Sequence, residues 1–364
     1  MNILYDYQVL LWQKYGGISR YFYELASRLS EKEQVAVPVF SSVNYYFEKF
    51  FDKASKDKQI PHTYRLVEFV NRYLTKKELK RQIDIFHPTY YSDYFLNYKS
   101  ISEGKTKFIL TVHDMTHEIF PQYFSADDKT AELKRKLIIR ADKIIAISEN
   151  TKKDILHFIP ETDPEKISVI YHSSSLRCDS GYKSKIDFPD KYILFVGQRS
   201  GYKNFEALAK AFSLVSKKKH DIMLLCVGGG TAFTAEEYQL LDRLGIADKV
   251  THMRLGDNDL CAAYSNALCF VFPSLYEGFG IPVLEAMANS CPAVLARASC
   301  LEEIGGDGAV YFDPYNEKEL ADIIFELNEE KRRDMISKGR RRSECFSWEK
   351  TTAQTLELYR QALK

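Results

Sequence analysis

The sequence predicts an α/β protein with two doubly wound domains, each built on a Rossmann-like parallel β-sheet. The chain has 364 residues, which is long for one domain and suits two of roughly 150–200 residues. Short apolar runs alternate with longer helical patterns along its whole length, and this alternation restarts near residue 190. These observations together predict two consecutive α/β halves.

The expected strands are short runs rich in β-branched residues that are apolar almost throughout. Such runs are typical of parallel strands covered by helices on both faces. The alternation of strand and helix implies right-handed crossovers within each half. In the order of the chain, the expected strands are 2–5, 35–40, 83–87, 107–113, 143–147 and 167–171, followed by 192–196, 222–227, 250–252, 269–272, 293–296 and 309–312.

A polar stretch between residues 173 and 191 lacks apolar periodicity and is interpreted as a linker. We therefore expect an N-terminal domain of residues 1–175, a linker of 176–190 and a C-terminal domain of 191–345. A last helix in 346–364 packs either on the C-terminal domain or back on the N-terminal one. Two such domains are expected to enclose a ligand cleft between the carboxyl ends of their sheets.

Composition excludes several classes of protein. The formal net charge of +1 gives no reason to expect a nucleic-acid partner. The seven cysteines are odd in number and contain no Cys-x-x-Cys pair, which argues against a disulfide framework or a zinc site. No signal peptide or apolar stretch of about 18–20 residues is present. We expect a cytoplasmic protein, with peripheral attachment to the inner face of the cell membrane left open.

One candidate site is the run from Glu277 to Glu285, Glu-Gly-Phe-Gly-Ile-Pro-Val-Leu-Glu. It follows an expected strand, and Pro282 suits the first turn of a helix. Gly278 and Gly280 allow a ligand to approach the backbone, and the free N–H groups of the helix start attract an anion. The two carboxylates are interpreted as ligands of sugar or ribose hydroxyls. The alternative is a strand–turn–helix with ordinary capping.

A second candidate site is the run from Gly197 to Asn204, Gly-Gln-Arg-Ser-Gly-Tyr-Lys-Asn, at the end of the first strand of the second half. Arg199 and Lys203, four residues apart on a glycine-containing loop, form a possible phosphate clamp. Asn204 is expected to cap the helix that follows. The alternative is a solvated basic loop.

Three further features lie at expected strand ends. Gly16-Gly17 precedes a helix and either admits a substrate or makes a tight turn. His113-Asp114 ends a strand; a lone histidine at such a place is more often structural than functional. The run from Gly228 to Gly230 ends another strand and is either a spacer or a contact. The G-x-G-x-x-G spacing of a nicotinamide site is absent.

Two stretches are basic. One extends from Arg72 to Arg81, and the other comprises Lys134-Arg135-Lys136 with Arg140. Charge runs are usually solvated helix faces. The alternative is an interfacial helix on anionic lipid.

With these residues considered together, the chain resembles the family 4 glycosyltransferases, retaining enzymes of the GT-B fold, over nearly its whole length. The variant Arg199-x-x-x-Lys203-Asn-Phe looks most like bacterial mannosyltransferases of surface polysaccharide synthesis. One departure is Tyr171-His172-Ser-Ser-Ser, where many relatives carry Pro-Asn-Gly, so His172 receives no role from the family. The motifs occur in family order: Gly16-Gly17-Ile-Ser-Arg, His113-Asp114, Ser148-Glu149-Asn, Gly197 with Arg199 and Lys203-Asn204, the Gly228 turn, and Glu277 to Glu285.

The resemblance implies a role for each site residue. Arg199 and Lys203 would neutralise the donor diphosphate, Glu277 would bind hydroxyls of the transferred sugar, and His113 would contact that sugar. Glu285 would bind the ribose. The implied donor-binding residues are Gly17, Gly197, Asn204, Gly278, Phe279, Gly280, Ile281 and Glu285.

The function expected from this resemblance is transfer of a mannose- or glucose-like hexose with retention of configuration. The donor would be a GDP- or UDP-linked sugar, and the acceptor an oligosaccharide or lipid-linked glycan. Neither a metal nor a further cofactor is expected, because arginine, lysine and helix-end N–H groups meet the negative charge. Two alternatives remain: a nucleotide-sugar epimerase of the same architecture, and a non-catalytic module that binds nucleotide sugar or glycan.

Overall fold

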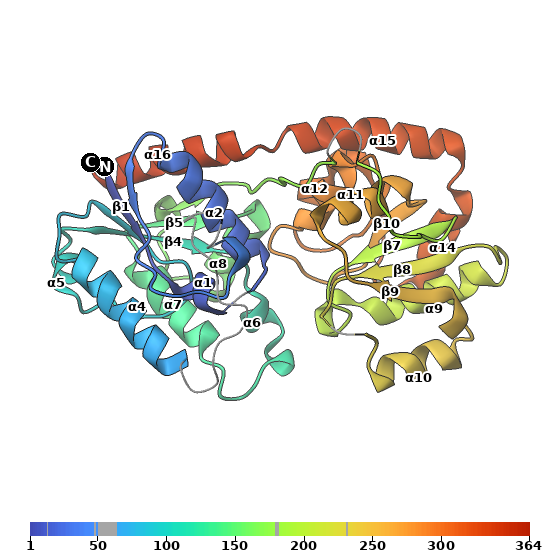
Figure 1. Cartoon of the computed structure of the whole chain (residues 1–364), viewed down its shortest axis with the longest axis horizontal. Coiled ribbons are helices and arrows are strands. Elements are labelled where there is room, and N and C mark those ends of the chain that lie inside the picture. Colours follow the sequence, from blue (N-terminus) through green and yellow to red (C-terminus); the bar gives the residue numbers. More distant parts are fainter. Residues whose placement is uncertain (13, 47–48, 50–63, 179–181, 231) are drawn as a thin grey trace. The chain divides into compact units, whose positions relative to one another are not determined.

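The computed structural model describes residues 1–12, 14–46, 49, 64–178, 182–230 and 232–364. It divides into two compact units (Figure 1). The first comprises Met1–His172 and Trp348–Lys364, and the second Ser173–Ser347. Each unit is built on a six-stranded parallel sheet, which confirms the predicted class of two doubly wound α/β halves.

In the first unit the strand order is β2-β1-β3-β4-β5-β6. Strand β2 ends at Ala36, so the expected strand over 35–40 is wrong in its second half. Pro38 explains the early end, because proline has no N–H to donate to a neighbouring strand. The strands are β1 (Asn2–Tyr5), β2 (Gln34–Ala36), β3 (Ile85–His87), β4 (Lys107–Val112), β5 (Lys143–Ala146) and β6 (Ile167–Val169).

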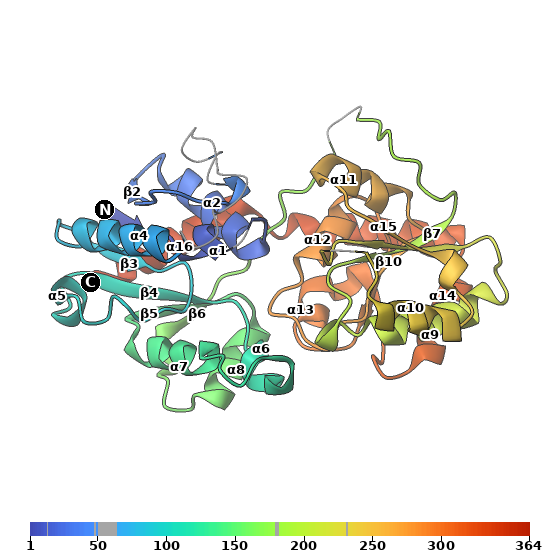
Figure 2. The ribbon, with the colours of Figure 1, turned by 60° about the horizontal axis from the view of Figure 1, so that its bottom comes forward.

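Helices cover both faces of this sheet, because alternate residues of each buried strand point to opposite sides. Helices α4, α7 and α8 pack on the face that carries Phe86. Helices α2 and α16 pack on the face that carries Ile85. Figure 2 shows α7 and α8 on the opposite side of strands β4–β6 from α2. The helices are α1 (Gln8–Trp12), α2 (Gly17–Leu29), α4 (Tyr64–Glu78), α5 (Lys99–Ser102), α6 (Thr116–Ile119), α7 (Thr130–Arg140), α8 (Glu149–Phe158) and α16 (Trp348–Ala362).

The last helix, α16, belongs to the first unit, although the second unit precedes it in the chain. Its Tyr359 is fully buried, with its hydroxyl 2.9 Å from that of Tyr5 and 2.6 Å from Nδ1 of His87. The other ring nitrogen of His87 lies 2.8 Å from the hydroxyl of Thr111. The helix is therefore held by a buried polar network as well as by apolar packing.

In the second unit the strand order is β12-β11-β10-β7-β8-β9. The described residues between 173 and 190 form neither helix nor strand. The strands are β7 (Tyr192–Val196), β8 (Met223–Val227), β9 (Val250–Met253), β10 (Cys269–Phe272), β11 (Ala293–Ala296) and β12 (Ala309–Phe312). The helices are α9 (Phe205–Ser216), α10 (Ala235–Arg243), α11 (Asp257–Asn266), α12 (Ile281–Ala288), α13 (Leu301–Gly305), α14 (Glu317–Glu326) and α15 (Glu329–Glu344).

Candidate functional site

The two strongest sequence motifs follow neighbouring strands of the second sheet. Strands β7 and β10 pair in the middle of the sheet, with Cys269 opposite Ile193 and Phe270 opposite Leu194. From this pair the chain winds outward in both directions, through β8 and β9 on one side and through β11 and β12 on the other. Ligands of doubly wound sheets bind beyond the carboxyl ends of the strands at such a reversal.

Lys203 and Glu277 meet at this point. The ammonium nitrogen of Lys203 lies 2.7 Å from a carboxylate oxygen of Glu277, and both side chains are largely buried. Lys203 ends a short 3₁₀ turn (Gly201–Lys203) after β7, and Glu277 follows β10. A backbone hydrogen bond from Leu275 to Tyr202 joins the same two loops. The structure thus brings a predicted phosphate ligand beside a predicted sugar ligand.

Helix α12 begins where the sequence predicts, with Pro282 in its first turn. Gly280 precedes it in the left-handed conformation, at φ +84°. A Cβ added there would come within 3.1 Å of Leu301, so glycine suits the position on both counts. Pro282 has no N–H, and the Val283 N–H donates to the Gly280 carbonyl oxygen at 2.9 Å. The start of a helix is nevertheless a place where backbone N–H groups attract an anion.

Glu285 lies on α12, eight residues after Glu277, and is buried. Its carboxylate accepts a hydrogen bond of 3.2 Å from the hydroxyl of Tyr264. Burial and this neighbouring carboxylate raise the pKa of Tyr264 well above its usual value, so the hydroxyl stays protonated as a donor. Tyr264 was not predicted as a site residue, and it holds Glu285 in place.

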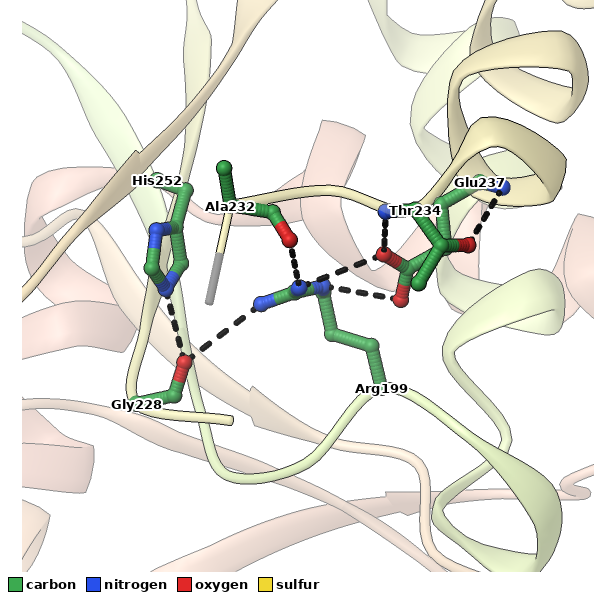
Figure 3. Close-up of polar contacts among 6 residues, drawn as sticks. All are labelled: Arg199, Gly228, Ala232, Thr234, Glu237 and His252. Carbon is green, nitrogen blue, oxygen red and sulfur yellow. Dashed lines mark hydrogen bonds and ion pairs between the residues drawn. The ribbon is translucent and has the colours of Figure 1, made fainter. Parts of the chain in front are cut away.

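Arg199 forms an ion pair that the sequence analysis missed (Figure 3). Its Nε and Nη2 atoms donate to the two carboxylate oxygens of Glu237, at 2.9 and 3.2 Å. The guanidinium also donates to the carbonyl oxygens of Ala232, at 3.3 Å, and Gly228, at 3.4 Å. Only 4% of the Arg199 side chain is exposed.

Glu237 carries a sequence signal that could have drawn attention to it. Thr234-x-x-Glu237 is a capping box: the Thr234 hydroxyl accepts from the Glu237 N–H, and the Glu237 carboxylate accepts from the Thr234 N–H. The box predicts the start of α10 but not the arginine that the carboxylate also holds. Contact between residues 38 positions apart depends on the tertiary fold.

The glycines after β8 lie against the glycine after β7. Gly228, Gly229 and Gly230 all have positive φ. A Cβ on Gly229 would stand 2.9 Å from the carbonyl oxygen of Gly197, so only glycine allows this approach. On the other side, the Gly228 carbonyl oxygen lies 2.7 Å from Nε2 of His252 on β9. The run is therefore packed within the protein on two sides, and a contact between it and a ligand stays a prediction.

The prediction that the Asn204 side chain caps α9 is also wrong. Asn204 occupies the residue before the helix, but its backbone is left-handed, with φ +56°, and its side chain makes no capping bond. A cap side chain bonds the first-turn N–H groups from an extended backbone, which Asn204 lacks. Its amide instead donates to the carbonyl oxygens of Pro273, at 3.2 Å, and Pro314, at 3.0 Å. Asn204 thereby joins the loops after β7, β10 and β12.

In the first unit, the helix that begins at Gly17 lies beside His113. Tyr21 of this helix packs edge-on against the His113 ring, with centroids 5.6 Å apart. His113 directly follows β4 and is buried, which lowers its pKa to about 4, although the neighbouring carboxylate of Asp114 opposes the shift. The histidine is therefore neutral at pH 7 and suited to hydrogen bonding rather than to charge compensation.

His172, which occupies the place where many relatives carry Pro-Asn-Gly, packs inside the first unit. Its ring centroid lies 4.4 Å from that of Tyr21 and 6.0 Å from that of Trp348 on α16. Burial lowers its pKa well below the usual histidine value. These contacts give His172 a packing role at the point where α16 meets α2.

Metal ligands are not gathered in the described part of the chain, where no three His, Cys, Asp or Glu side chains are arranged to hold an ion. The pair Asp257-Asn-Asp259 stands in the first turn of α11. Asp259 accepts hydrogen bonds from Tyr182, at 2.8 Å, and Ser184, at 2.6 Å. Metal independence stays a prediction.

Comparisons with known proteins agree with this arrangement. Residues 15–173 match the model of Glycosyltransferase Family 4, and residues 181–342 match that of Glycosyl transferases group 1. The chain belongs to the family 4 glycosyltransferases. The O-antigen chain mannosyltransferase RfbU of Salmonella typhimurium is 31% identical over 63% of this chain and 62% of its own length. The O-antigen chain mannosyltransferase B of Escherichia coli is 24% identical over 94% of this chain and 96% of its own.

Solved structures confirm the GT-B fold of this glycosyltransferase. Sucrose-phosphate synthase from Thermosynechococcus elongatus superposes with a TM-score of 0.75 at 17% identity, covering 99% of this chain and 98% of the other. Anabaena Alr3699/HepE in complex with UDP superposes with a TM-score of 0.72 at 18% identity, covering 98% and 99%. In the described ranges of the glycosyltransferase, no helix is long and apolar enough to cross a membrane.

Proposed function

We propose that this glycosyltransferase moves a mannose- or glucose-like hexose from a GDP- or UDP-linked donor to an oligosaccharide or lipid-linked glycan. Retention of configuration and action at the cytoplasmic side of the membrane are parts of the same proposal. Mannosyltransferases among its relatives support the sugar, and the UDP bound to a structural neighbour supports the type of donor. The observation that carries the proposal is the meeting of Lys203 and Glu277 at the reversal point of the second sheet.

The chemistry requires stabilisation of a leaving diphosphate. As the sugar–phosphate bond breaks, positive charge grows at the anomeric carbon and negative charge grows on the diphosphate. Lys203 and the N–H groups at the start of α12, around Phe279, Gly280 and Ile281, then act on a charge that is larger in the transition state than in the bound donor. They lower the barrier as well as binding the donor, and in this proposal no metal takes part.

Glu277 has two tasks in this scheme. Without a donor it accepts from Lys203, and this contact fixes the ammonium group beside the helix start. With a donor present it binds hydroxyls of the transferred sugar, while Lys203 turns to the diphosphate. Glu285, held by Tyr264, binds the ribose. In the first unit, Gly17 contacts the diphosphate and neutral His113 contacts the sugar.

Arg199 and Lys203 each pair with a carboxylate, but Arg199 is held by two contacts to Glu237 and Lys203 by one to Glu277. Both oxygens of Glu237 already bind it, and its side chain is more deeply buried than that of Lys203. We therefore propose that Lys203 makes the larger contribution to diphosphate stabilisation. Arg199 contributes partly by holding the glycine loop after β8 against the loop after β7, where Gly197 lies.

Calorimetric titration with GDP, UDP and their hexose conjugates tests the proposal, followed by transfer assays with the nucleotide that binds. Lys203→Ala and Glu285→Ala are expected to abolish detectable transfer while the fold is kept. Lys210→Ala, an exposed lysine of α9 with an ion-pair partner in Glu206, is the matched control and should transfer normally. Unchanged turnover in both site variants, or no binding of any nucleotide, would contradict the proposal.

A further inference from the structure

Helix α4 presents an unusual outer face. Its inner side carries the fully buried Asn71 and Thr75, and Asn71 accepts a hydrogen bond of 2.7 Å from the Phe40 N–H in the segment after β2. Leu66, Phe69 and Tyr73 are 63%, 67% and 60% exposed. Single exposed apolar side chains are ordinary on a protein surface, whereas three on one short helix form a patch that indicates an interaction site.

Helix geometry places these three side chains together. At about 100° per residue, Leu66, Phe69 and Tyr73 fall within roughly 60° of one another, opposite Asn71 and Thr75. Three exposed lysines continue the same face toward the end of the helix and the turn after it: Lys76, Lys77 and Lys80. The outer face is therefore apolar in its first half and basic in its second.

The charge on this face is of one sign. The acidic residues of the helix, Glu68 and Glu78, lie at its flanks toward the sheet and are only partly exposed. Within the described ranges no carboxylate pairs with Lys77 or Lys80. Lys76 lies 5.4 Å from the centre of the Tyr98 ring, a contact that keeps its positive charge.

A cavity of about 590 Å³ opens at the basic end of this face. Its lining is net basic, since only Asp84 and Glu103 oppose the cations, and Glu103 already pairs with Lys105, at 2.6 Å. Asp84 accepts from the backbone N–H of Asn2. The basic residues of the lining are Lys76, Lys80, Arg81, Lys99 and Lys105.

The second basic stretch of the sequence differs from α4. Lys134 is fully buried and pairs with Glu118, at 2.8 Å, so it is not a surface charge as the sequence analysis assumed. Arg135 pairs with Glu161, and Lys136 pairs with Asp93, at 2.5 Å. Three of the four cations of this stretch, Lys134, Arg135 and Lys136, therefore pair with carboxylates within the protein, unlike Lys77 and Lys80 of α4.

We propose that the outer face of α4 docks the protein on an anionic lipid surface. Leu66, Phe69 and Tyr73 enter the boundary between headgroups and acyl chains, while the lysines contact lipid phosphates. The cavity beside them accepts the phosphate of one headgroup. An apolar stripe combined with clustered lysines is the pattern that binds such surfaces, and a purely apolar protein interface would not need the unpaired cations.

Vesicle flotation of the full chain tests this docking. Phosphatidylcholine vesicles serve as the neutral surface, and phosphatidylcholine mixed with phosphatidylglycerol as the anionic one. We expect flotation with the anionic vesicles alone, weakened by added salt. Lys77→Ala with Lys80→Ala should lower the partition coefficient about 25-fold, at about fivefold per lysine near the surface. The second variant, Phe69→Ser with Tyr73→Ser, removes two of the three apolar side chains and should abolish flotation.

Matched controls come from the same unit. Ile139→Ser removes an exposed apolar side chain of α7, and Lys129→Ala with Lys153→Ala removes two exposed lysines elsewhere. Both should float like the parent. The docking does not depend on sugar transfer, so binding of GDP or UDP in solution should be equal in all variants and shows that each is folded.

Three outcomes would overturn the proposal. They are absence from anionic vesicles, equal binding to neutral vesicles, and equal losses in the α4 and control variants. A dimer in solution that dissociates in the Phe69→Ser with Tyr73→Ser variant, without flotation of the parent, would instead assign the face to a second copy of the chain. Loss of nucleotide binding with flotation retained would count against the proposed function alone.

Discussion

Replacement of Glu237 by alanine tests the buried ion pair beside the candidate site. The change leaves the Arg199 guanidinium, only 4% exposed, without the carboxylate that binds two of its nitrogens. Removing one partner of a buried pair costs roughly 3–5 kcal/mol. The carbonyl contacts to Gly228 and Ala232 remain, so the low end applies. The Thr234 N–H also loses its bond to the Glu237 carboxylate, which adds about 1 kcal/mol, while the bond from the N–H of residue 237 to the Thr234 hydroxyl is kept. We therefore expect the free energy of unfolding of the second unit to fall by about 4 kcal/mol in Glu237→Ala.

The double variant Arg199→Met with Glu237→Met separates the burial of charge from the loss of contacts. Both charges are then absent, and apolar side chains of similar volume fill the space. Such replacements of buried pairs are often close to neutral. We therefore expect the double variant to be roughly 2–3 kcal/mol more stable than Glu237→Ala.

The assay must report on the second unit. Both tryptophans of the chain, Trp12 and Trp348, lie in the first unit, so their fluorescence reports on that unit. Amide hydrogen exchange in peptides of β8 and α10 gives the free energy of opening in the second unit, with fluorescence-detected urea unfolding as internal reference. Glu236→Ala, the exposed neighbour on the same helix, is the control. A loss below about 1 kcal/mol in Glu237→Ala, or an equal loss in the control, would refute the reasoning.

Three further predictions concern the glycine loop, α16 and pH. Gly229→Ala, at φ +73°, places a Cβ 2.9 Å from the Gly197 carbonyl oxygen and should weaken nucleotide binding measured by calorimetry. Its control is Gly230→Ala, at φ +80°, where the added Cβ meets no atom within 4 Å. This control should lower the free energy of unfolding by only about 1–2 kcal/mol. Tyr359→Phe removes a hydroxyl 2.6 Å from His87 and should cost about 1–3 kcal/mol in urea unfolding followed by tryptophan fluorescence; no loss would contradict the buried network. The pKa of His113 is lowered from 6.5 to about 4, so the unfolded chain binds the proton at a higher pH than the folded protein does. The contribution of His113 to the free energy of unfolding is therefore complete above pH 6.5 and falls by up to roughly 3 kcal/mol toward pH 4. In His113→Gln this dependence of stability on pH should be weaker.

The elements with strong local signals were predictable. Apolar runs located the central strands such as β7 and β10, and Pro282 after a glycine pair located the start of α12. The end of β2 was missed although Pro38 marked it, because the apolar run continues past that proline.

The sequence predicted site residues within single loops, but not the contacts between loops. The sequence offered Lys203 and Glu277, and the order of the strands brings them together. It could not offer Glu237 as the partner of Arg199, because that contact depends on how the loop after β8 folds over the loop after β7. For Asn204, residue type favoured a cap, whereas the left-handed backbone directs its amide elsewhere.

The course of the chain through the two units has a consequence for synthesis on the ribosome. The second unit is one continuous segment, Ser173–Ser347, inserted between the two pieces of the first. All of it leaves the ribosome before α16 does, so it can fold while the first sheet still lacks the helix that covers Tyr5 and His87. Until Tyr359 arrives, 354 residues after Tyr5, α2 covers that face without α16, and the part that α16 later buries is exposed on the nascent protein.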